Sequence, residues 1–509
     1  MGEIKIALFA DDTQCYISDL KAVDIWFQHL HTYELASGAV VNINKSFGIL
    51  IGLLKGQEHV CNKIKWTDGP ILALGVNHGI KLEQVLFWEN MVNKFKNILS
   101  VWKKRNLTLF GKSYVVKSLG VSTLLFAFKV LNVPENVLKA VNKIIWDFIW
   151  DGKPDKVKRE VCTRQTIFGG LGVPNVKNIL CAQRLLFLGN VFSGGNEHWK
   201  LLPRYFLKVY NNNRTGILQL DTPIDEYCIP PFYKTCLKMW KNVQGEKFPS
   251  VVINTITNYF QPILQERQHL NFPEDAQINF ENSLYLKDTN GTWVDLNTCK
   301  QKEAVNLIDE TLIKSKNEEF WENTYYDDIE WSLVYRTETY ILLSQRVKEF
   351  HWKCINNCVM TEKRLIKMNI SDGLCKLCEC DTEDLIHVLC DCDSIVGFWK
   401  FVINIIITNI SSYKYLESEV ILGCMNGNLC MREKQIVNFF ILNAKWIVWK
   451  RRCRIIFEND WINEKNMLYW FVNDLKYQQQ LLMSSKNTSV RYLAEKLILN
   501  FNVNETVDK

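Results

Sequence analysis

A short segment near residue 380 carries four side chains of the types that bind metals. Cys375 and Cys378 are followed by eight residues and His387, then by four residues and Cys392, which gives a C-x₂-C-x₈-H-x₄-C spacing. Three thiolates and one imidazole suit a tetrahedral Zn²⁺ ion. The cysteine pair predicts a tight knuckle, and the His–Cys pair predicts a helical turn that closes it. The motif therefore demands a compact module at this place in the chain.

The alternatives to zinc are a disulfide and unliganded thiols. The chain has 17 cysteines, an odd number, and its first residues lack the long apolar core of a secretory signal. We expect an intracellular, reducing compartment in the nucleus or cytoplasm, where disulfides are disfavoured. Unliganded thiols stay open as an alternative, and Cys380 or Cys390 could replace a ligand. With four protein ligands the zinc would be structural, because no coordination position is left for chemistry.

Hydrophobic periodicity predicts an α+β chain with a small sheet at the N-terminus and mostly helices beyond it. The helix at 22–37 should end at Gly38, since glycine commonly follows a helix. The most apolar run, residues 401–410, is too short to cross a membrane. We expect strands at residues 4–17, 40–51 and 71–76, and helices at residues 22–37, 86–192, 331–368 and 394–499.

Asp11 and Asp12 lie at the predicted turn between two short strands. Adjacent carboxylates repel each other, so placing them beside an apolar strand favours a bound cation. Mg²⁺ prefers such hard oxygen ligands, and a pair of these ions can activate a hydroxyl and stabilise a leaving pyrophosphate. For an isolated Asp-Asp pair the alternative is an ordinary exposed turn.

Charge is distributed unevenly. The net charge of +6 is mild, but residues 90–134 contain no Asp or Glu. Lysines there could neutralise nucleic-acid phosphates without reading the base sequence. Helices with basic, solvated faces and no ligand are the alternative, and they are the favoured interpretation of a second cluster at Lys450, Arg451, Arg452 and Arg454. The basic residues predicted to bind nucleic acid are Lys94, Lys96, Lys103, Lys104, Arg105, Lys112 and Lys117.

Several segments, in order, resemble the reverse transcriptases of non-long-terminal-repeat (LINE-type) retrotransposons. The resemblance rests on Phe9-Ala-Asp-Asp12, on the segment 37–46, on Leu74-Gly-Val76 and on several stretches between residues 102 and 174. It implies that Asp11 and Asp12 are metal-binding carboxylates of the polymerase palm and that Lys45 acts near the phosphates of the incoming nucleotide. The cysteine–histidine segment is similar to the zinc-binding domain of the same elements.

The resemblance divides the chain into five regions and implies RNA and DNA as partners. They are a truncated palm remnant (1–85), a helical thumb-like basic region (86–192), a connecting region (193–330), a zinc-binding domain (331–400) and a C-terminal helical region (401–509). The thin sheet of such a partial palm would leave apolar surface exposed.

The resemblance also bears on catalysis. The family requires fingers and a third carboxylate before the Asp pair, and ten residues, at about 3.5 Å each, are too short to supply them. We expect a nucleic-acid-binding fragment that does not polymerise DNA alone, and that binds Mg²⁺ only if a missing N-terminal polymerase part completes the palm. An active enzyme completed in that way and an inert retroelement relic are the alternatives.

Overall fold

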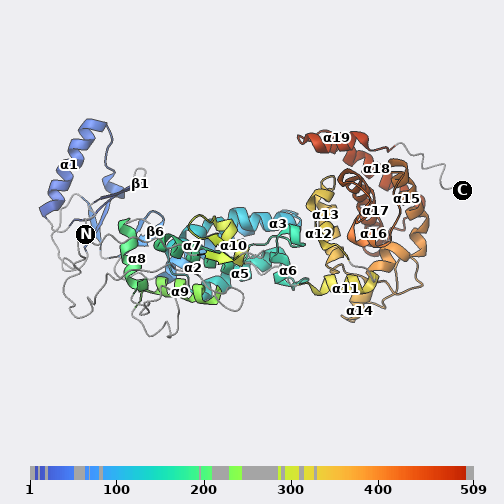
Figure 1. Cartoon of the computed structure of the whole chain (residues 1–509), viewed down its shortest axis with the longest axis horizontal. Coiled ribbons are helices and arrows are strands. Elements are labelled where there is room, and N and C mark those ends of the chain that lie inside the picture. Colours follow the sequence, from blue (N-terminus) through green and yellow to red (C-terminus); the bar gives the residue numbers. More distant parts are fainter. Residues whose placement is uncertain are drawn as a thin grey trace. The chain divides into compact units, whose positions relative to one another are not determined.

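The computed structural model describes residues 6–9, 12–17, 21–50, 64–67, 69–78, 84–193, 197–208, 229–243, 285–287, 293–308, 314–325 and 329–499. Helices predominate in this part of the chain, and each described sheet has two strands (Figure 1). The α+β prediction, with small sheets near the N-terminus and mostly helices after them, is confirmed.

The described chain forms two compact units, and each is discontinuous in sequence. The first comprises Met1–Ile98, Val121–Asn142 and Val176–Asp309, and the second comprises Leu99–Gly120, Lys143–Asn175 and Glu310–Lys509. The five regions predicted from the sequence remain a prediction, since they were drawn on resemblance and not on packing.

The first unit begins with a hairpin and a helix. Strand β1 (Ile6–Phe9) pairs antiparallel with β2 (Asp12–Cys15), as the two short apolar runs predicted. Helix α1 (Lys21–Ser37) follows and ends at Gly38, where φ is +72°, a conformation that glycine adopts without strain. The prediction of this helix and of its end is confirmed.

The predicted strand at 40–51 is only partly a strand. Residues Ile43–Lys45 form a 3₁₀ turn, because the side chain of Asn42 accepts a hydrogen bond from the backbone N–H of Lys45 at 3.2 Å. Strand β3 (Phe47–Ile49) follows and pairs in parallel with β4 (Lys65–Thr67). Residue 51 lies outside the described residues.

The predicted strand at 71–76 is a tight hairpin. Strand β5 (Ile71–Ala73) turns back on β6 (Val76–His78) through Leu74 and Gly75, whose φ angles are 51° and 76°. Two successive positive φ angles are what a two-residue hairpin turn needs. The apolar pattern predicted one continuous strand here and did not indicate the turn, because leucine rarely adopts a positive φ angle.

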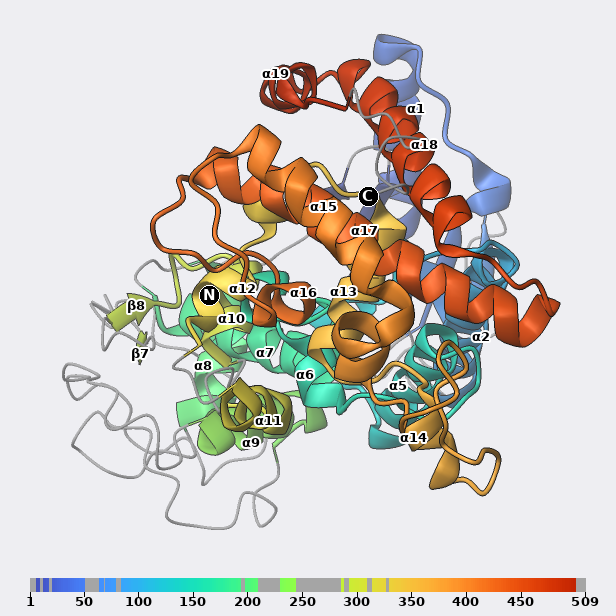
Figure 2. The ribbon, with the colours of Figure 1, turned by 90° about the vertical axis from the view of Figure 1, so that its right-hand side faces the viewer.

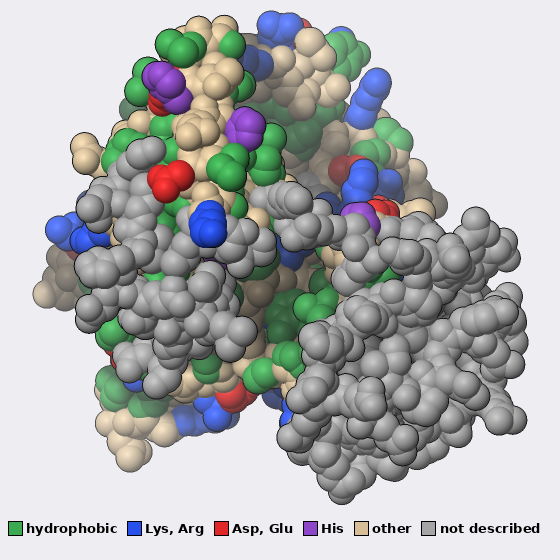
Figure 3. Space-filling view, turned by 90° about the vertical axis from the view of Figure 1, so that its left-hand side faces the viewer, with side chains coloured by type: hydrophobic (Ala, Val, Ile, Leu, Met, Phe, Trp, Pro, Cys, Tyr) green, Lys and Arg blue, Asp and Glu red, His purple; other side chains and the backbone are tan. Residues whose placement is uncertain are grey.

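These N-terminal elements expose large apolar side chains, as expected for a thin sheet. Leu8 and Phe9 on β1 and Leu35 on α1 are each more than half exposed. Figure 3 shows green hydrophobic side chains among the polar ones on this face of the molecule.

The rest of the first unit is built on helix α7 (Val176–Phe192). Leu185 and Leu188 of this helix pack with Leu237 and Trp240 in one buried cluster. Parts of the predicted connecting region are thus helical. The remaining elements of this unit include α4 (Leu125–Val130), α8 (His198–Lys208), α9 (Pro231–Val243), β7 (Tyr285–Lys287), β8 (Trp293–Asp295) and α10 (Gln301–Ile308). Helices α2 (Gln84–Lys103) and α5 (Glu135–Ile149) have residues in both units.

The second unit is built around helix α17 (Met431–Glu458), 28 residues long. Its middle is buried on all sides, with Phe439, Phe440 and Leu442 fully buried, so other helices must surround it. Helices α13, α15, α16 and α18 contact it, and Figure 2 shows this group in colours from yellow (α13) to red (α18). The other bounds are α3 (Leu109–Val115), α6 (Arg159–Thr163), α11 (Lys316–Tyr325), α12 (Trp331–Val334), α13 (Gln345–Ile355), α14 (Glu362–Ile366), α15 (Val396–Asn409), α16 (Ser418–Leu422), α18 (Glu464–Met483) and α19 (Thr488–Lys496).

Two polar side chains meet inside this core. The Lys445 Nζ atom lies 2.9 Å from Nδ1 of His351 and donates a hydrogen bond to the carbonyl oxygen of Ile421 at 3.1 Å. Burial lowers the pKa of Lys445 to about 8. Burial, together with the charge of Lys445, holds the pKa of His351 well below its usual range.

Replacing Lys445 with Met should change how stability depends on pH. The folded-state pKa of Lys445, about 8, lies below its unfolded value, so the unfolded chain binds more protons between these values. Between pH 8 and 10 the free energy of unfolding should therefore rise by about 2 kcal/mol more in the wild type than in the variant. Denaturant unfolding of both proteins at a series of pH values measures the effect. A wild-type-minus-variant difference that stays constant over this range would contradict the assignment.

Candidate zinc centre

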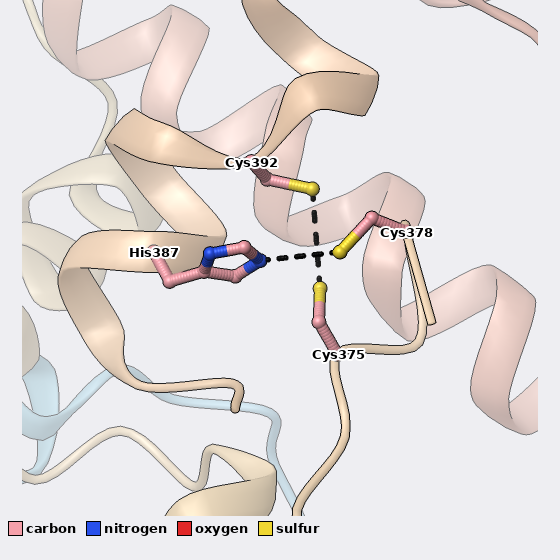
Figure 4. Close-up of side chains that lie close together, drawn as sticks. All are labelled: Cys375, Cys378, His387 and Cys392. Carbon is pink, nitrogen blue, oxygen red and sulfur yellow. Dashed lines mark hydrogen bonds between the residues drawn. The ribbon is translucent and has the colours of Figure 1, made fainter. Parts of the chain in front are cut away.

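The four residues of the cysteine–histidine motif converge in the second unit (Figure 4). The Sγ atoms of Cys375, Cys378 and Cys392 and a ring nitrogen of His387 all lie within 4.8 Å of one another. The Cys375 and Cys392 sulfurs are 3.9 Å apart, and the Cys378 sulfur is 3.4 Å from Nε2 of His387. A tetrahedral zinc site with Zn–S near 2.3 Å and Zn–N near 2.0–2.1 Å requires separations of about 3.8 and 3.6 Å. The observed spacing fits that geometry.

Hydrogen bonds to sulfur favour the thiolate forms that a metal needs. The backbone N–H of Leu377 donates to Sγ of Cys375 at 3.4 Å, and the Ser394 hydroxyl lies 3.1 Å from Sγ of Cys392. The hydrogen bond between the two sulfurs lowers the pKa of Cys392, and the same contact raises the pKa of Cys375. The two sulfurs are thus close enough to share a proton, which a bound cation would displace.

The loop that carries the cysteine pair is fixed by its own backbone. The N–H of Cys375 donates to the Asp381 carbonyl at 2.7 Å, and the N–H of Glu379 donates to the Cys375 carbonyl at 2.8 Å. Gly373 precedes the pair with φ +83°, and a Cβ atom there would lie 2.1 Å from the Ile366 side chain. Only glycine fits both the dihedral angle and the close approach.

Asp384 orients the histidine. Its Oδ1 atom accepts the backbone N–H of His387 at 2.9 Å and that of Ile386 at 3.1 Å. This contact satisfies N–H groups at the start of the short helical turn His387–Asp391, as a helix cap does. His387 therefore leaves the turn in a defined direction, toward the three sulfurs (Figure 4).

A buried ion triad joins this module to helix α17. The guanidinium of Arg452 lies 2.6 Å from Oε1 of Glu362 and 2.8 Å from Oε1 of Glu383. The three side chains are 3%, 5% and 0% exposed. Glu383 also accepts the backbone N–H of Glu362 at 3.0 Å. The charges are thus desolvated but extensively hydrogen-bonded, the condition under which a buried ion pair is tolerated.

The neighbouring Arg451 ties α17 to the other side of the motif. It donates to the backbone carbonyls of Ser394 and Ile462 at 2.9 Å each, and Ser394 is two residues beyond the ligand Cys392. The solvated-face interpretation of this basic cluster is therefore wrong for Arg451 and Arg452. The missed signal was two arginines following an apolar helical run, with one glutamate before the Cys375/Cys378 pair and another after it.

The structure places the predicted polymerase residues in the first unit. Asp12 begins β2 and is exposed, Lys45 ends the 3₁₀ turn and is exposed, and Asp11 lies outside the described residues. Their roles remain predictions.

The predicted nucleic-acid-binding residues differ in exposure. Lys112 is 7% exposed, and its Nζ atom lies 2.7 Å from Asp151 and 3.2 Å from the Ile149 carbonyl oxygen. This lysine holds two segments of the second unit together, so it is not available to a ligand. The other six are exposed and form no ion pair with any described residue; they are Lys94, Lys96, Lys103, Lys104, Arg105 and Lys117.

Comparison with known proteins now assigns the module. Residues 316–399 match the family described as zinc-binding in reverse transcriptase, and this range contains all four converging side chains. The chain is related to the reverse transcriptases of non-LTR retrotransposons. It therefore carries a reverse-transcriptase zinc-binding domain, and its Cys₃His cluster is a candidate structural zinc site.

Two relatives extend the similarity beyond this domain. Over 253 residues the chain is 23% identical to the transposon TX1 uncharacterized 149 kDa protein of Xenopus laevis, covering 47% of this chain and 19% of that protein. Over 346 residues it is 20% identical to a putative ribonuclease H protein of Arabidopsis thaliana, covering 62% and 55%. The chain thus spans less than two thirds of either relative. Among the described helices, none is both long and apolar enough to cross a membrane.

Replacing Arg452 with Met should destabilise this reverse-transcriptase-related protein strongly. The change leaves Glu362 and Glu383 buried without their cation, which costs about 3–5 kcal/mol. Arg454→Met is the matched control, because Arg454 pairs with Glu458 at the surface and such pairs contribute less than about 1 kcal/mol. Thermal and denaturant unfolding measure both. Equal losses in the two variants would contradict a special role for the triad.

Proposed function

We propose that this chain binds RNA and DNA through its exposed basic residues between positions 94 and 117. The observation that carries the proposal is that six cations in this stretch form no ion pair with any described residue. The stretch also lies in a segment without Asp or Glu, so the local potential is positive. Phosphates are the ligands that such a surface attracts, with release of counterions on binding.

The cations fall into two groups, and each is described within its own unit. Lys94 and Lys96 lie on α2 in the first unit. The other four belong to the second unit: Lys103, Lys104 and Arg105 lie at and just after the end of α2, and Lys117 lies further along the chain. The guanidinium of Arg105 lies 4.8 Å from the Trp102 ring centroid, a cation–π contact that holds it without neutralising it. Contacts between such cations and phosphates would bind the nucleic-acid backbone and would not read the base sequence.

The zinc centre has a structural role in this proposal. One Zn²⁺ would be bound by Cys375, Cys378, His387 and Cys392. The charge of the ion would neutralise the thiolates, and its bonds to the four side chains would hold the loop closed. Because the cluster requires reduced thiols, we place the protein inside the cell. The domain would then support the C-terminal helices, to which Arg451 and Arg452 connect it.

We further propose that the chain does not polymerise DNA alone. Nucleotide transfer with two Mg²⁺ ions needs carboxylates that converge from separate strands. Asp12 lies on an exposed two-stranded hairpin, which alone is not such a site. Primer extension with Mg²⁺ or Mn²⁺ is the test. Templated product from the purified chain, lost in Asp12→Ala, would favour the alternative of an active reverse transcriptase.

The zinc assignment predicts one bound ion per chain. The double change Cys375→Ser/Cys378→Ser should reduce the zinc content from about one to near zero per chain and lower the unfolding midpoint, since serine does not replace thiolate ligands. Elemental analysis after dialysis measures the zinc. Cys380→Ser is the control, because Cys380 is exposed and lies outside the cluster, so it should keep its zinc. Unchanged zinc in the double variant would contradict the assignment.

The binding proposal predicts a loss of salt-dependent affinity. The triple change Lys103→Gln/Lys104→Gln/Arg105→Gln should weaken duplex binding and reduce the slope of log affinity against log salt by about 2.7, since each phosphate contact contributes about 0.9. Fluorescence anisotropy with a labelled RNA–DNA duplex measures this change.

A matched triple variant controls for net charge. Lys400, Lys414 and Lys486 are exposed lysines of the second unit outside the basic stretch, and their change to Gln removes the same charge. This control should leave the slope nearly unchanged. Equal effects of the two triple variants would show that only overall charge matters, and would refute a localised site.

A further inference from the structure

Helix α18 presents a face whose composition the zinc centre and the packing do not explain. One row of residues four apart, from Lys465 through Tyr469, Asn473 and Tyr477 to Leu481, is exposed along the whole helix. Residues spaced in this way lie on one side of a helix. The row therefore forms a continuous surface that alternates aromatic and hydrogen-bonding side chains.

No fully exposed residue of α18 carries a negative charge. The two acids of the helix are both partly buried, and Asp474 accepts a hydrogen bond from Gln478 at 2.6 Å. Lys476 extends the row on its flank, next to Tyr477. The side chains of Lys465 and Lys476 form no ion pair with any described residue. Among the residues of α18, the exposed face thus carries positive charge only.

The two tyrosines are unusually open for aromatic side chains. Tyr469 and Tyr477 are each 61% exposed, and neither side chain hydrogen-bonds to any described residue. They are eight positions apart, which is about 12 Å along the helix axis. Exposed aromatic rings can stack on planar groups such as nucleic-acid bases. One flexible nucleic-acid strand can contact two rings at this distance.

The opposite side of α18 fixes this face in place. Leu468, Phe471 and Leu475 are buried, and α18 packs on α15 and α17 within the same unit. Gln478 also donates to the side chain of Asn443 in the middle of α17 at 2.8 Å. Figure 2 shows α18 in red beside these helices. The backbone of the exposed row is therefore pre-organised, which lowers the entropic cost of binding.

We propose that this face of α18, defined by Lys465, Tyr469, Asn473, Lys476 and Tyr477, binds single-stranded nucleic acid. The proposal rests on the nucleic-acid binding proposed above and adds a second site of different chemistry. Stacking on tyrosine requires unpaired bases, since the bases of a duplex are already stacked on each other. Lysines would contact the phosphates, and the Asn473 amide can donate to or accept from base edges. Because tyrosine stacks on any base, little sequence preference is expected.

The test uses the full chain and labelled 12-nucleotide oligo(U) and oligo(dT), with a 12-base-pair duplex for comparison. Tyr469→Ala/Tyr477→Ala should weaken oligonucleotide binding at least about tenfold and leave duplex binding within about twofold, since stacking on one ring typically contributes fivefold or more. Tyr469→Phe/Tyr477→Phe keeps both rings and should bind as the wild type does. Lys465→Gln/Lys476→Gln should reduce the salt slope for oligonucleotides by about 1.4.

A control variant separates stacking from general exposure of aromatic rings. Phe457 and Trp461 are exposed in the same unit but lie beside Glu458 and Asp460, so Phe457→Ala/Trp461→Ala should leave oligonucleotide binding unchanged. Preference for oligo(U) over oligo(dT), or the reverse, supports the site and identifies its natural strand. Circular dichroism of every variant establishes that the fold is kept.

Three outcomes would overturn the inference. The first is a wild type that binds the duplex but neither oligonucleotide, which leaves the basic stretch intact as a site. The second is an alanine double variant that folds and binds oligonucleotides as the wild type does. The third is displacement of the oligonucleotide by poly-glutamate at an equal charge concentration, which would show an acidic protein to be the better partner. Loss of duplex binding alone would refute the proposed function and leave the α18 site standing.

Discussion

The buried contact of Arg452 with Glu362 and Glu383 is the constraint on which the second unit depends. One glutamate lies in α14 before the cysteine pair, and the other lies between that pair and His387. A single guanidinium on α17 therefore fixes both sides of the loop that presents the zinc ligands. Since the three charged groups are shielded from water, any rearrangement that separates them leaves an unpaired buried charge, which is strongly unfavourable in free energy.

This contact explains why the module and the C-terminal helices share one core. Trp399 packs beneath the loop and donates to the Leu389 carbonyl at 2.9 Å, while Trp352 donates to the Gly169 carbonyl at 2.8 Å. Both indoles are buried and have structural roles. The two surfaces that we propose to bind nucleic acid, the basic stretch and the exposed face of α18, do not include these indoles.

Features that depend on residues close together in the sequence could be predicted, and features that depend on distant residues could not. The four residues of the candidate zinc site lie within eighteen residues, so their spacing alone predicted that they converge, and the helix ending at Gly38 carried its own stop signal. The partners of Arg452 lie 69 and 90 residues away, and that of Lys112 lies 39 residues away. No periodicity within a helix reports such partners. Burial of these cations could therefore be learned only from the folded chain.

The interleaving of the two units along the sequence has a practical consequence. The range that matches the zinc-binding family begins at residue 316, yet its Trp352 hydrogen-bonds to Gly169, and Arg164 lies 3.5 Å from Glu318. A polypeptide that starts at residue 310 would leave Trp352 and Glu318 without these partners. A polypeptide restricted to the matched range should therefore unfold more easily than the second unit, because it lacks residues that this unit packs against it.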